Sequence, residues 1–511
     1  MRTDRALKNS IVSMISYFVL ILFGFVTQRI FKDTLGTEYL GINGLYGNIM
    51  TGLNIVELGF GSAIVANMYR PVAENDKPKI IALMKYYRKV YHYIAIIVLT
   101  FGLCVLPFVP IIVGDISVEL KLRFIFLMYL LDSVVSYFLS YKRSLLYANQ
   151  ESYYTMYVNM AIVAFRSCLQ IFALIWTLNF YLYLIISIVF KLIENVINNV
   201  IVNTKYPYIQ MKSEHVLDED TVTDIKKKVR GLLFHKLANF VVFGTDNIII
   251  STMPNLGIVW VGLYSNYSMI TSKLTFLIDA VFNSVTASVG NMLVENDSKK
   301  DYDMFRNMML INTWIYIFIS ISFYFFSFPF IAIWMGNDFV LDKATVFVVS
   351  LNLFVSGLRA PYGTFKAAGG IFYEDRYVPV IESVVNIVFS VPLAYCFGLK
   401  GVLTGTMCST MVLFVYSYPT FVYKKIFGKS LKAYWCDFLK SIGMYMIAMV
   451  ITSGVMLFVY VSDKWLQLFI TGSICVCIPN LTIYIIVRKT KEYAFCRKLM
   501  KRLKLKFIRR I

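Results

Sequence analysis

Long apolar runs recur from one end of the chain to the other, separated by short polar segments. A helical run of about 20 apolar residues is long enough to cross the roughly 30 Å of hydrocarbon in a bilayer. The pattern predicts fourteen membrane-spanning helices, near residues 10–31, 39–68, 91–113, 122–142, 155–176, 180–203, 231–252, 257–290, 307–334, 344–366, 377–397, 401–422, 438–461 and 466–487. We therefore expect an all-α integral membrane protein.

Composition supports this fold class and excludes several others. Apolar residues make up 58% of the 511 positions, and the mean hydropathy is +0.65, values that an ordinary soluble protein does not reach. The formal charge is +20, but no soluble basic domain exists that could bind nucleic acid. The eight cysteines and three histidines lack the spacing of a metal site or a disulfide framework, so we expect no resident cofactor.

The distribution of basic residues predicts the orientation in the membrane. Loops on one side contain basic clusters such as Arg70–Lys89, Lys226–Arg230 and Lys424–Lys432. Loops on the other side are short and poor in charge, near residues 32–38, 114–120, 335–343 and 398–400. Because basic loops stay in the cytoplasm, both termini are expected there.

The C-terminal tail after the last predicted span is also basic. As a helix, residues 489–511 place Tyr493, Cys496, Leu499, Leu503 and Phe507 on one face among lysines and arginines. Such a helix can lie on anionic lipid at the cytoplasmic face, with each basic residue contributing about 1 kcal/mol. A simple anchor that stops translocation is the alternative interpretation.

Short phrases recur 221 positions apart. Leu35-Gly36 with Gly41 and Tyr46 recur as Leu256-Gly257 with Gly262 and Tyr267, and Glu74-Asn75-Asp76 with Lys79 recurs as Glu295-Asn296-Asp297 with Lys300. At an offset of 220, Asp132 and Ser136 align with Asn352 and Ser356, and Tyr153, Tyr157 and Val158 align with Tyr373, Tyr377 and Val378.

These matches divide the chain into two copies of a helical unit. We predict an N-lobe at 1–220 and a C-lobe at 221–430, each with six spans, followed by two further helices at 431–488 and the tail at 489–511. Six is even, so the copies enter the bilayer in the same orientation and are parallel repeats about a pseudo-twofold axis along the membrane normal.

The stretch from Leu35 to Tyr46, followed by Val56 to Ile64, resembles the Wzx-type flippases of bacterial polysaccharide repeat units. These belong to a superfamily that also holds multidrug antiporters and the peptidoglycan-precursor flippase. The resemblance implies two lobes around a central cavity that opens alternately to each side of the bacterial cytoplasmic membrane. It also implies an undecaprenyl-pyrophosphate-linked oligosaccharide as cargo, for capsule, exopolysaccharide, O-antigen or teichoic-type polymers. Polysaccharide polymerase and glycosyltransferases are then the expected protein partners.

Charged residues inside the predicted spans are candidate site residues. Each costs at least about 2.5–3.5 kcal/mol at the bilayer centre unless it meets water or a partner. Cations and amides suit a pyrophosphate head, because guanidinium groups bind phosphate oxygens in pairs. The cargo candidates are Arg29, Asn54, Arg166, Lys273 and Arg359, and the candidates for cation coupling are the carboxylates Glu57, Asp132, Asp246 and Asp279.

Structural roles remain the alternative for several of these positions. Lys191 and Glu194 are three residues apart on one span and can neutralise each other. Arg166 and Glu382 lie on equivalent spans, and each can form an ion pair within its own lobe. Glu57 and Asp279 correspond within one position under the repeat and can serve as a contact between the lobes.

The energy source is a separate question. The sequence lacks the GxxxxGK[ST] phosphate loop, so we do not expect ATP hydrolysis. Outward movement of an anionic head down an inside-negative potential releases about 2.3 kcal/mol per charge per 100 mV. Antiport driven by a Na⁺ or H⁺ gradient is the alternative.

Three other functions fit parts of the sequence pattern. A cation-coupled multidrug exporter of the same superfamily is expected to have twelve spans, and the cavity of a peptidoglycan-precursor flippase to be dominated by cations. A membrane-embedded polysaccharide polymerase needs a large outer loop, whereas every predicted outer loop here is under about 12 residues. We therefore expect a transporter rather than an enzyme.

Overall fold

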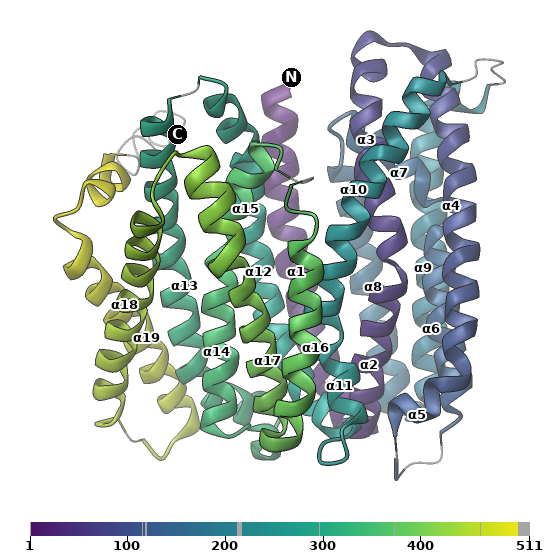
Figure 1. The fold of residues 1–511 in the computed structure, drawn as a ribbon. Coiled ribbons are helices and arrows are strands. Elements are labelled where there is room, and N and C mark those ends of the chain that lie inside the picture. The colour runs from purple at the N-terminus through teal and green to yellow at the C-terminus, as the bar shows by residue number, and fades with distance from the viewer. Residues whose placement is uncertain are drawn as a thin grey trace. The chain divides into compact units, whose positions relative to one another are not determined.

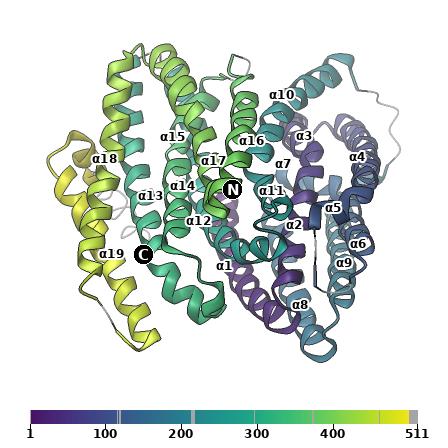
Figure 2. The ribbon, with the colours of Figure 1, turned by 60° about the horizontal axis from the view of Figure 1, so that its bottom comes forward.

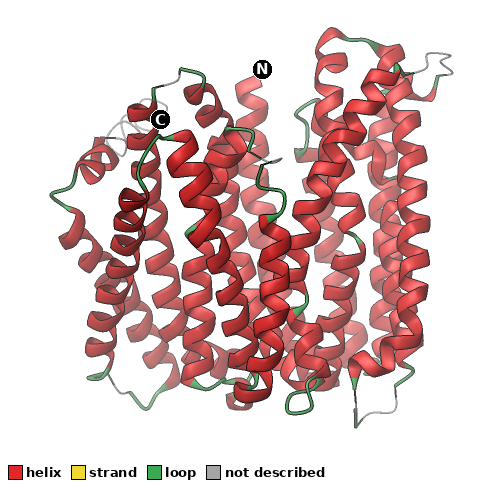
Figure 3. Ribbon diagram, viewed as in Figure 1, coloured by secondary structure: helices red, strands yellow, loops and turns green. Residues whose placement is uncertain are grey.

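A computed structural model describes residues 2–498, apart from 115, 118–119, 212–216, 296, 372–373 and 460. The described residues form helices joined by turns and loops, without a strand among them (Figure 3). The chain divides into two compact units, Met1–Ser265 and Asn266–Ile511. Each unit is described by itself.

The helices of the first unit follow one another with short connections. They are α1 (Arg2–Leu35), α2 (Thr37–Leu53), α3 (Ile55–Glu74), α4 (Lys77–Val105), η1 (Leu106–Phe108), α5 (Val109–Val113), α6 (Leu122–Tyr137), η2 (Ser140–Lys142), α7 (Arg143–Ala148), α8 (Tyr153–Thr177), α9 (Phe180–Lys205), η3 (Pro207–Gln210), α10 (Glu219–Gly244) and α11 (Asp246–Thr252).

Packing in the first unit places α4, α6 and α9 side by side, while α1 runs along α8 and α3 packs against α4 and α10 (Figure 1). Aromatic side chains fill the spaces between these helices. The Phe31 and Phe180 rings meet edge to face at 5.5 Å, and those of Tyr46 and Phe126 at 5.4 Å. Edge-to-face geometry is favoured because the positive ring edge meets the negative ring face.

The helix α12 (Ile258–Leu293) begins in the first unit and ends in the second. The helices that follow are α13 (Ser298–Trp334), η4 (Asn337–Phe339), α14 (Lys343–Gly357), α15 (Arg359–Ala368), α16 (Val378–Phe397), α17 (Leu399–Val412), η5 (Leu413–Ile426, with wide π turns), α18 (Leu431–Met456) and α19 (Lys464–Val487).

In the second unit α13 packs against α14, α18 and α19, and α16 packs closely along α17 (Figure 2). Two glycines permit the α16–α17 contact. A Cβ on Gly401 would lie 1.9 Å from the Leu393 carbonyl oxygen, and one on Gly405 would lie 2.5 Å from the Ser390 backbone nitrogen. Small residues allow such backbone approach between membrane helices, where packing replaces the hydrophobic effect.

Among the described residues, ten helical segments are long and apolar enough to span a bilayer, and α6 with α7 adds an eleventh as a pair bent by 40°. Three further predicted spans correspond to α2 with α3, to α10 with α11, and to α12. The bend between α6 and α7 and the break between α2 and α3 each interrupt one of the predicted spans. The predicted all-α membrane fold with about fourteen spans is confirmed.

Equivalent residues of the sequence repeat perform equivalent structural tasks. Asp76 accepts a hydrogen bond from the Lys79 backbone N–H (3.0 Å) at the start of α4, and Asp297 accepts one from the Lys300 N–H (3.1 Å) at the start of α13. Such caps satisfy N–H groups that the first helical turn leaves without partners. The repeated Asn-Asp therefore marks the same helix start twice.

The repeated tyrosines agree in the same way. The Tyr46 hydroxyl donates to the Leu122 carbonyl oxygen (3.2 Å), and the Tyr267 hydroxyl donates to the Phe339 carbonyl oxygen (3.3 Å). Each bond ties a buried tyrosine to the chain close to the start of a later helix, α6 or α14.

The division into units differs from the lobe boundary predicted at residue 220. The compact first unit extends to Ser265, because α10 packs on α3 and α11 packs on α2 and α5. The boundary at residue 220 is based on the sequence repeat, whereas the boundary of the compact units is based on packing contacts. The lobe boundary at 220 therefore stays a prediction.

The start of the predicted tail helix lies within the described residues. Positions 491–498 are helical, and the Tyr493 ring stacks against Trp314 of α13 with centroids 6.3 Å apart. Leu499, Leu503 and Phe507 lie outside the described residues. The described part of the tail thus packs on protein, and the contact of the tail with lipid stays a prediction.

Candidate functional site

Six ionisable side chains gather in the membrane-spanning part of the first unit, and we call them the first charged cluster. They are Glu57 of α3, Asp132 of α6, Arg143 of α7, Arg166 of α8, and Lys191 and Glu194 of α9. Three are acids and three are bases, so the cluster is formally neutral.

Glu194 is the centre of this cluster. One carboxylate oxygen lies 3.3 Å from the Arg143 guanidinium and the other lies 3.3 Å from the Lys191 ammonium. The Glu194 side chain is only 6% exposed. A carboxylate buried to this extent needs ionic or hydrogen-bonding partners, and it has both cations.

Buried amides extend the cluster. Arg143 also donates to the Asn195 side-chain oxygen, and the Asn195 amide donates to the Val135 carbonyl oxygen at 3.0 Å. The predicted fourth span ended at residue 142, so Arg143 was not recognised as an intramembrane charge. The bend after α6 carries the chain on into α7, and Arg143 is its first residue. The only sequence signal for this role was the position of Arg143 directly after an apolar run.

Asp132 and Arg166 lie on another side of the cluster. Asp132 lies near both Lys191 and Arg166. The Nε of Arg166 is buried, and among the described residues no acceptor meets it. A guanidinium carries five donors in a planar fork, so this group retains capacity for another anion.

Asn54 occupies the break between α2 and α3. Its side-chain oxygen accepts hydrogen bonds from the Ser133 hydroxyl (2.5 Å) and the Tyr137 hydroxyl (2.6 Å), both on α6. These bonds fix the break against α6. The predicted contact of Asn54 with cargo therefore competes with a structural role that the geometry explains.

The remaining candidates of the first unit lie apart. Arg29 pairs with Asp33 at 2.5 Å on α1, and both side chains are more than one-third exposed. Asp246, the first residue of α11, is 5% exposed and lies near Tyr264.

A second group, which we call the second charged cluster, lies in the second unit. Arg359 and Glu382 form an ion pair at 2.9 Å in which the carboxylate side chain is 2% exposed. This is the pairing within one unit that the sequence left as an alternative for Glu382. Asp279 of α12 lies near Arg359 and is itself exposed.

Lys366 and Asp375 complete the second charged cluster. They form an ion pair, and the Ser417 hydroxyl donates to Asp375 at 2.9 Å. The Asp375 side chain is 1% exposed. The other candidate cation, Lys273 of α12, is half-buried.

Outside the spans, acidic caps have lowered pKa values. A hydrogen bond from the Thr221 hydroxyl, together with Lys79 at 3.4 Å, lowers the pKa of Asp218 to about 2. Burial works against the effect at Asp342, but hydrogen bonds from Thr345 still lower the pKa of that carboxyl. Both residues stay ionised at neutral pH and fix helix starts. Among the described residues, no group of histidine, cysteine and acidic side chains is arranged to hold a metal ion.

The match to a family model shows which family the chain belongs to. Residues 6–288, more than half of the chain, match the model of the family described as "Polysaccharide biosynthesis protein". The chain belongs to this family. A search of curated proteins finds no match to the sequence.

Solved structures show which fold the family member has. The lipid II flippase MurJ in an inward closed conformation superposes with a TM-score of 0.63 at 14% identity, covering 94% of this chain and 98% of that one. An inward-facing multidrug resistance MATE family transporter of the MOP superfamily gives 0.60 at 15% identity, covering 80% and 95%. A MATE transporter of Vibrio cholerae gives 0.58 at 15%, covering 86% and 97%. The family predicted from the sequence is confirmed, and the chain shares the fold of these structures.

Proposed function

We propose that this family member is a flippase that moves undecaprenyl-pyrophosphate-linked oligosaccharide repeat units to the outer leaflet of the bacterial cytoplasmic membrane by alternating access. The observation that carries the proposal is the match to the polysaccharide biosynthesis family over residues 6–288. The similarity to a lipid II flippase over 94% of the chain supports it.

The intramembrane charges support a hydrophilic cargo. Each hydroxyl of a sugar head that loses its hydrogen bonds in hydrocarbon costs several kcal/mol, so the head needs polar surroundings on its way. Both units have carboxylates and cations inside spans, in the first charged cluster and in the Arg359–Glu382 pair of the second. A helix surface that only contacts acyl chains has no need of charged side chains, which are costly in hydrocarbon.

Within this proposal, the cations are the groups that meet the pyrophosphate. Arg166 is the strongest candidate of the first unit, because its buried Nε has no acceptor among the described residues. Arg359 would exchange part of its bond with Glu382 for phosphate oxygens. Arg29, Lys273 and Asn54 remain further cargo candidates.

The carboxylates are the groups that would couple flipping to a cation. Asp132 and Glu57 lie beside cations of the first charged cluster, and Asp279 lies beside Arg359. Arrival of Na⁺ or H⁺ at such a carboxylate would release the neighbouring arginine or lysine for the cargo. Asp246 is the fourth candidate, and the membrane potential is the alternative driving force.

Deletion of the gene in its host tests the proposal. A flippase defect accumulates lipid-linked repeat units in the cytoplasmic leaflet and abolishes surface polysaccharide, and the intact gene restores both. Complementation with Arg166→Gln, Arg29→Ala, Lys273→Ala and Asp132→Asn then tests the residues. Full activity in all four variants would refute the proposed site while leaving the flippase assignment intact.

A cation-coupled multidrug exporter is the second candidate, because the MATE transporters share the fold. That function predicts unchanged lipid intermediates in the deletion strain and a reduced efflux of cationic dyes. Altered dye efflux with normal polysaccharide would replace the first proposal by this one.

A further inference from the structure

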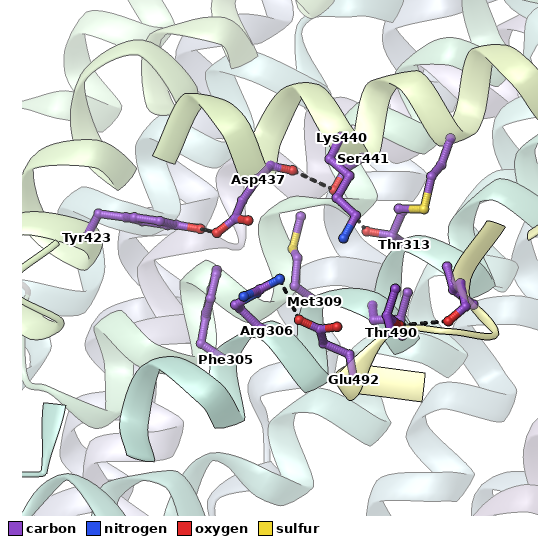
Figure 4. A pocket seen from close by; sticks show the side chains of 13 residues that line it. Phe305, Arg306, Met309, Thr313, Tyr423, Asp437, Lys440, Ser441, Thr490 and Glu492 are labelled. Carbon is purple, nitrogen blue, oxygen red and sulfur yellow. Dashed lines mark hydrogen bonds and ion pairs between the residues drawn. The ribbon is translucent and has the colours of Figure 1, made fainter. Parts of the chain in front are cut away.

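A pocket lies in the second unit where α13, α18 and the end of α19 converge (Figure 4). α13 contributes Arg306 and Thr313, α18 contributes Asp437, Lys440 and Ser441, and the segment after α19 contributes Glu492. The first half of α13, the first half of α18 and the end of α19 all lie toward the cytoplasm in the predicted orientation. The pocket is therefore expected at the level of the lipid headgroups.

Two of the four charged residues in the pocket satisfy each other. The Arg306 guanidinium lies 2.5 Å from the Glu492 carboxylate, whose side chain is 12% exposed. This ion pair joins α13 to the start of the tail helix, and it adds no net charge to the pocket.

The other two charged residues have no ionic partner among the residues that the structure describes. Asp437 accepts hydrogen bonds from the hydroxyls of Tyr302 (2.6 Å) and Tyr423 (2.9 Å), which are neutral donors. Lys440 is exposed, its ammonium points from α18 toward the α13 side of the pocket, and no acceptor meets it among the described residues (Figure 4). The pocket thus offers one carboxylate and one ammonium that form no ion pair with any described residue.

We propose that this pocket binds the headgroup of a zwitterionic phospholipid with a primary amine, of the phosphatidylethanolamine type. The lipid phosphate pairs with the exposed ammonium of Lys440. The lipid ammonium pairs with Asp437. The primary amine matters because it carries N–H donors for a carboxylate, whereas the quaternary amine of phosphatidylcholine carries none.

The surroundings favour a lipid over a soluble phosphate. Leu439 and Ile447 of α18 and Ile485 of α19 are 61%, 49% and 53% exposed, and they form apolar surface on two of the three helices that line the pocket. Acyl chains can lie along this surface while the headgroup occupies the pocket. A soluble phosphoethanolamine would gain nothing from it.

Asp437 and Lys440 also lie three positions apart on α18, so the competing explanation is that they only neutralise each other. The two explanations differ in what the single variants do. If the pair is only internal, Asp437→Asn and Lys440→Gln change lipid binding alike and without headgroup selectivity. If each binds a different part of the headgroup, Asp437→Asn changes the selectivity for the amine, whereas Lys440→Gln weakens the binding of both phosphate-bearing headgroups.

Native mass spectrometry of the full chain in a neutral detergent measures this directly. The probes are palmitoyl-oleoyl phosphatidylethanolamine, phosphatidylglycerol and phosphatidylcholine, added one at a time. The unmodified protein should bind phosphatidylethanolamine about tenfold more tightly than phosphatidylcholine. Asp437→Asn should weaken phosphatidylethanolamine about tenfold and strengthen phosphatidylglycerol, whereas Lys440→Gln should weaken both.

Lys432→Gln is the matched control, since Lys432 is an exposed lysine on α18 outside the pocket. It should leave all three affinities within about twofold. An unchanged ratio of phosphatidylethanolamine to phosphatidylglycerol in Asp437→Asn would overturn the proposal, as would an equal loss in Lys432→Gln. Soluble phosphoethanolamine that competes at the same concentration as the lipid would overturn the assignment to a lipid. None of these results depends on whether the protein is a flippase.

Discussion

Gly41 and Gly262, equivalent residues of the sequence repeat, lie against each other inside the first unit. A Cβ on Gly262 would lie 3.1 Å from the Gly41 backbone nitrogen and 2.6 Å from the Thr37 carbonyl oxygen. A Cβ on Gly41 would lie 2.1 Å from the Ile258 carbonyl oxygen. The two copies of the repeated phrase therefore place their glycines at one close contact between α2 and α12.

Gly41→Ala should consequently destabilise the protein, because the new methyl group meets backbone atoms that cannot move aside cheaply. We expect a clearly lower midpoint of thermal unfolding in detergent, and less folded protein in the membrane. Gly47→Ala is the control on the same helix, since no described atom outside the helix's own backbone lies within 4 Å of its Cβ position. It should be neutral or slightly stabilising, by up to about 1 kcal/mol, because alanine favours the helix. Equal behaviour of the two variants would contradict the close contact.

Glu194→Gln should be the most damaging single change in the first charged cluster. It leaves the two cations Arg143 and Lys191 without their shared carboxylate, and removing one partner of a buried pair costs about 3 kcal/mol. Lys191→Gln should cost only about 1 kcal/mol, because the Arg143–Glu194 bond remains and Lys191 is 28% exposed. Thermal unfolding of the purified variants measures the difference, and a larger effect of Lys191→Gln would refute the central position of Glu194.

Arg359 and Glu382 provide a double-mutant test in the second unit. Each single change, Arg359→Met or Glu382→Gln, should lower stability by about 2 kcal/mol, since one charge is left without its partner. The double variant should be less destabilised than the sum of the two singles. Strict additivity in the unfolding midpoints would mean that the 2.9 Å pair contributes no coupling.

The cap of α10 predicts a pH dependence with a definite sign. The pKa of Asp218 is about 2 in the folded protein, below the value of about 3.9 for an unperturbed aspartate. Its stabilising contribution is therefore fully present above about pH 4 and is lost as the pH falls toward 2. A ¹³C NMR titration of the Asp218 carboxyl should show a midpoint near 2, and Thr221→Ala should raise it. The same midpoint in both proteins would exclude the hydroxyl as the main cause.

The sequence predicted the helical fold well because apolar run length and repeated phrases are local signals. Asp76 and Asp297 illustrate the second signal, since the phrase recognised only as a repeat lies at two equivalent helix starts in the structure. The i, i+3 pair of Lys191 and Glu194 was equally readable, because both residues lie on one helix.

The partners of the charged residues were less predictable, because they come from helices that are distant in sequence. Arg143 lies at a bend, and a span predicted from a straight apolar run ends just before it. Its bonds to Glu194 and Asn195 join α7 to α9. Similarly, the buried Asp375 lies in a loop, and only the fold brings it to Lys366 and Ser417. Pocket charges such as Lys440 had no signal that separated them from the other basic residues near the membrane surface.

Reconstitution tests the proposed flippase most directly. The purified chain is inserted into liposomes that carry a labelled undecaprenyl-pyrophosphate oligosaccharide, and a glycosidase or lectin added outside measures how fast the inner-leaflet pool becomes accessible. We predict protein-dependent exposure of the head that accelerates when an outside-positive potential or a cation gradient is imposed, and that slows in Arg166→Gln. Liposomes that expose the lipid no faster with the folded protein than without it would contradict the central claim.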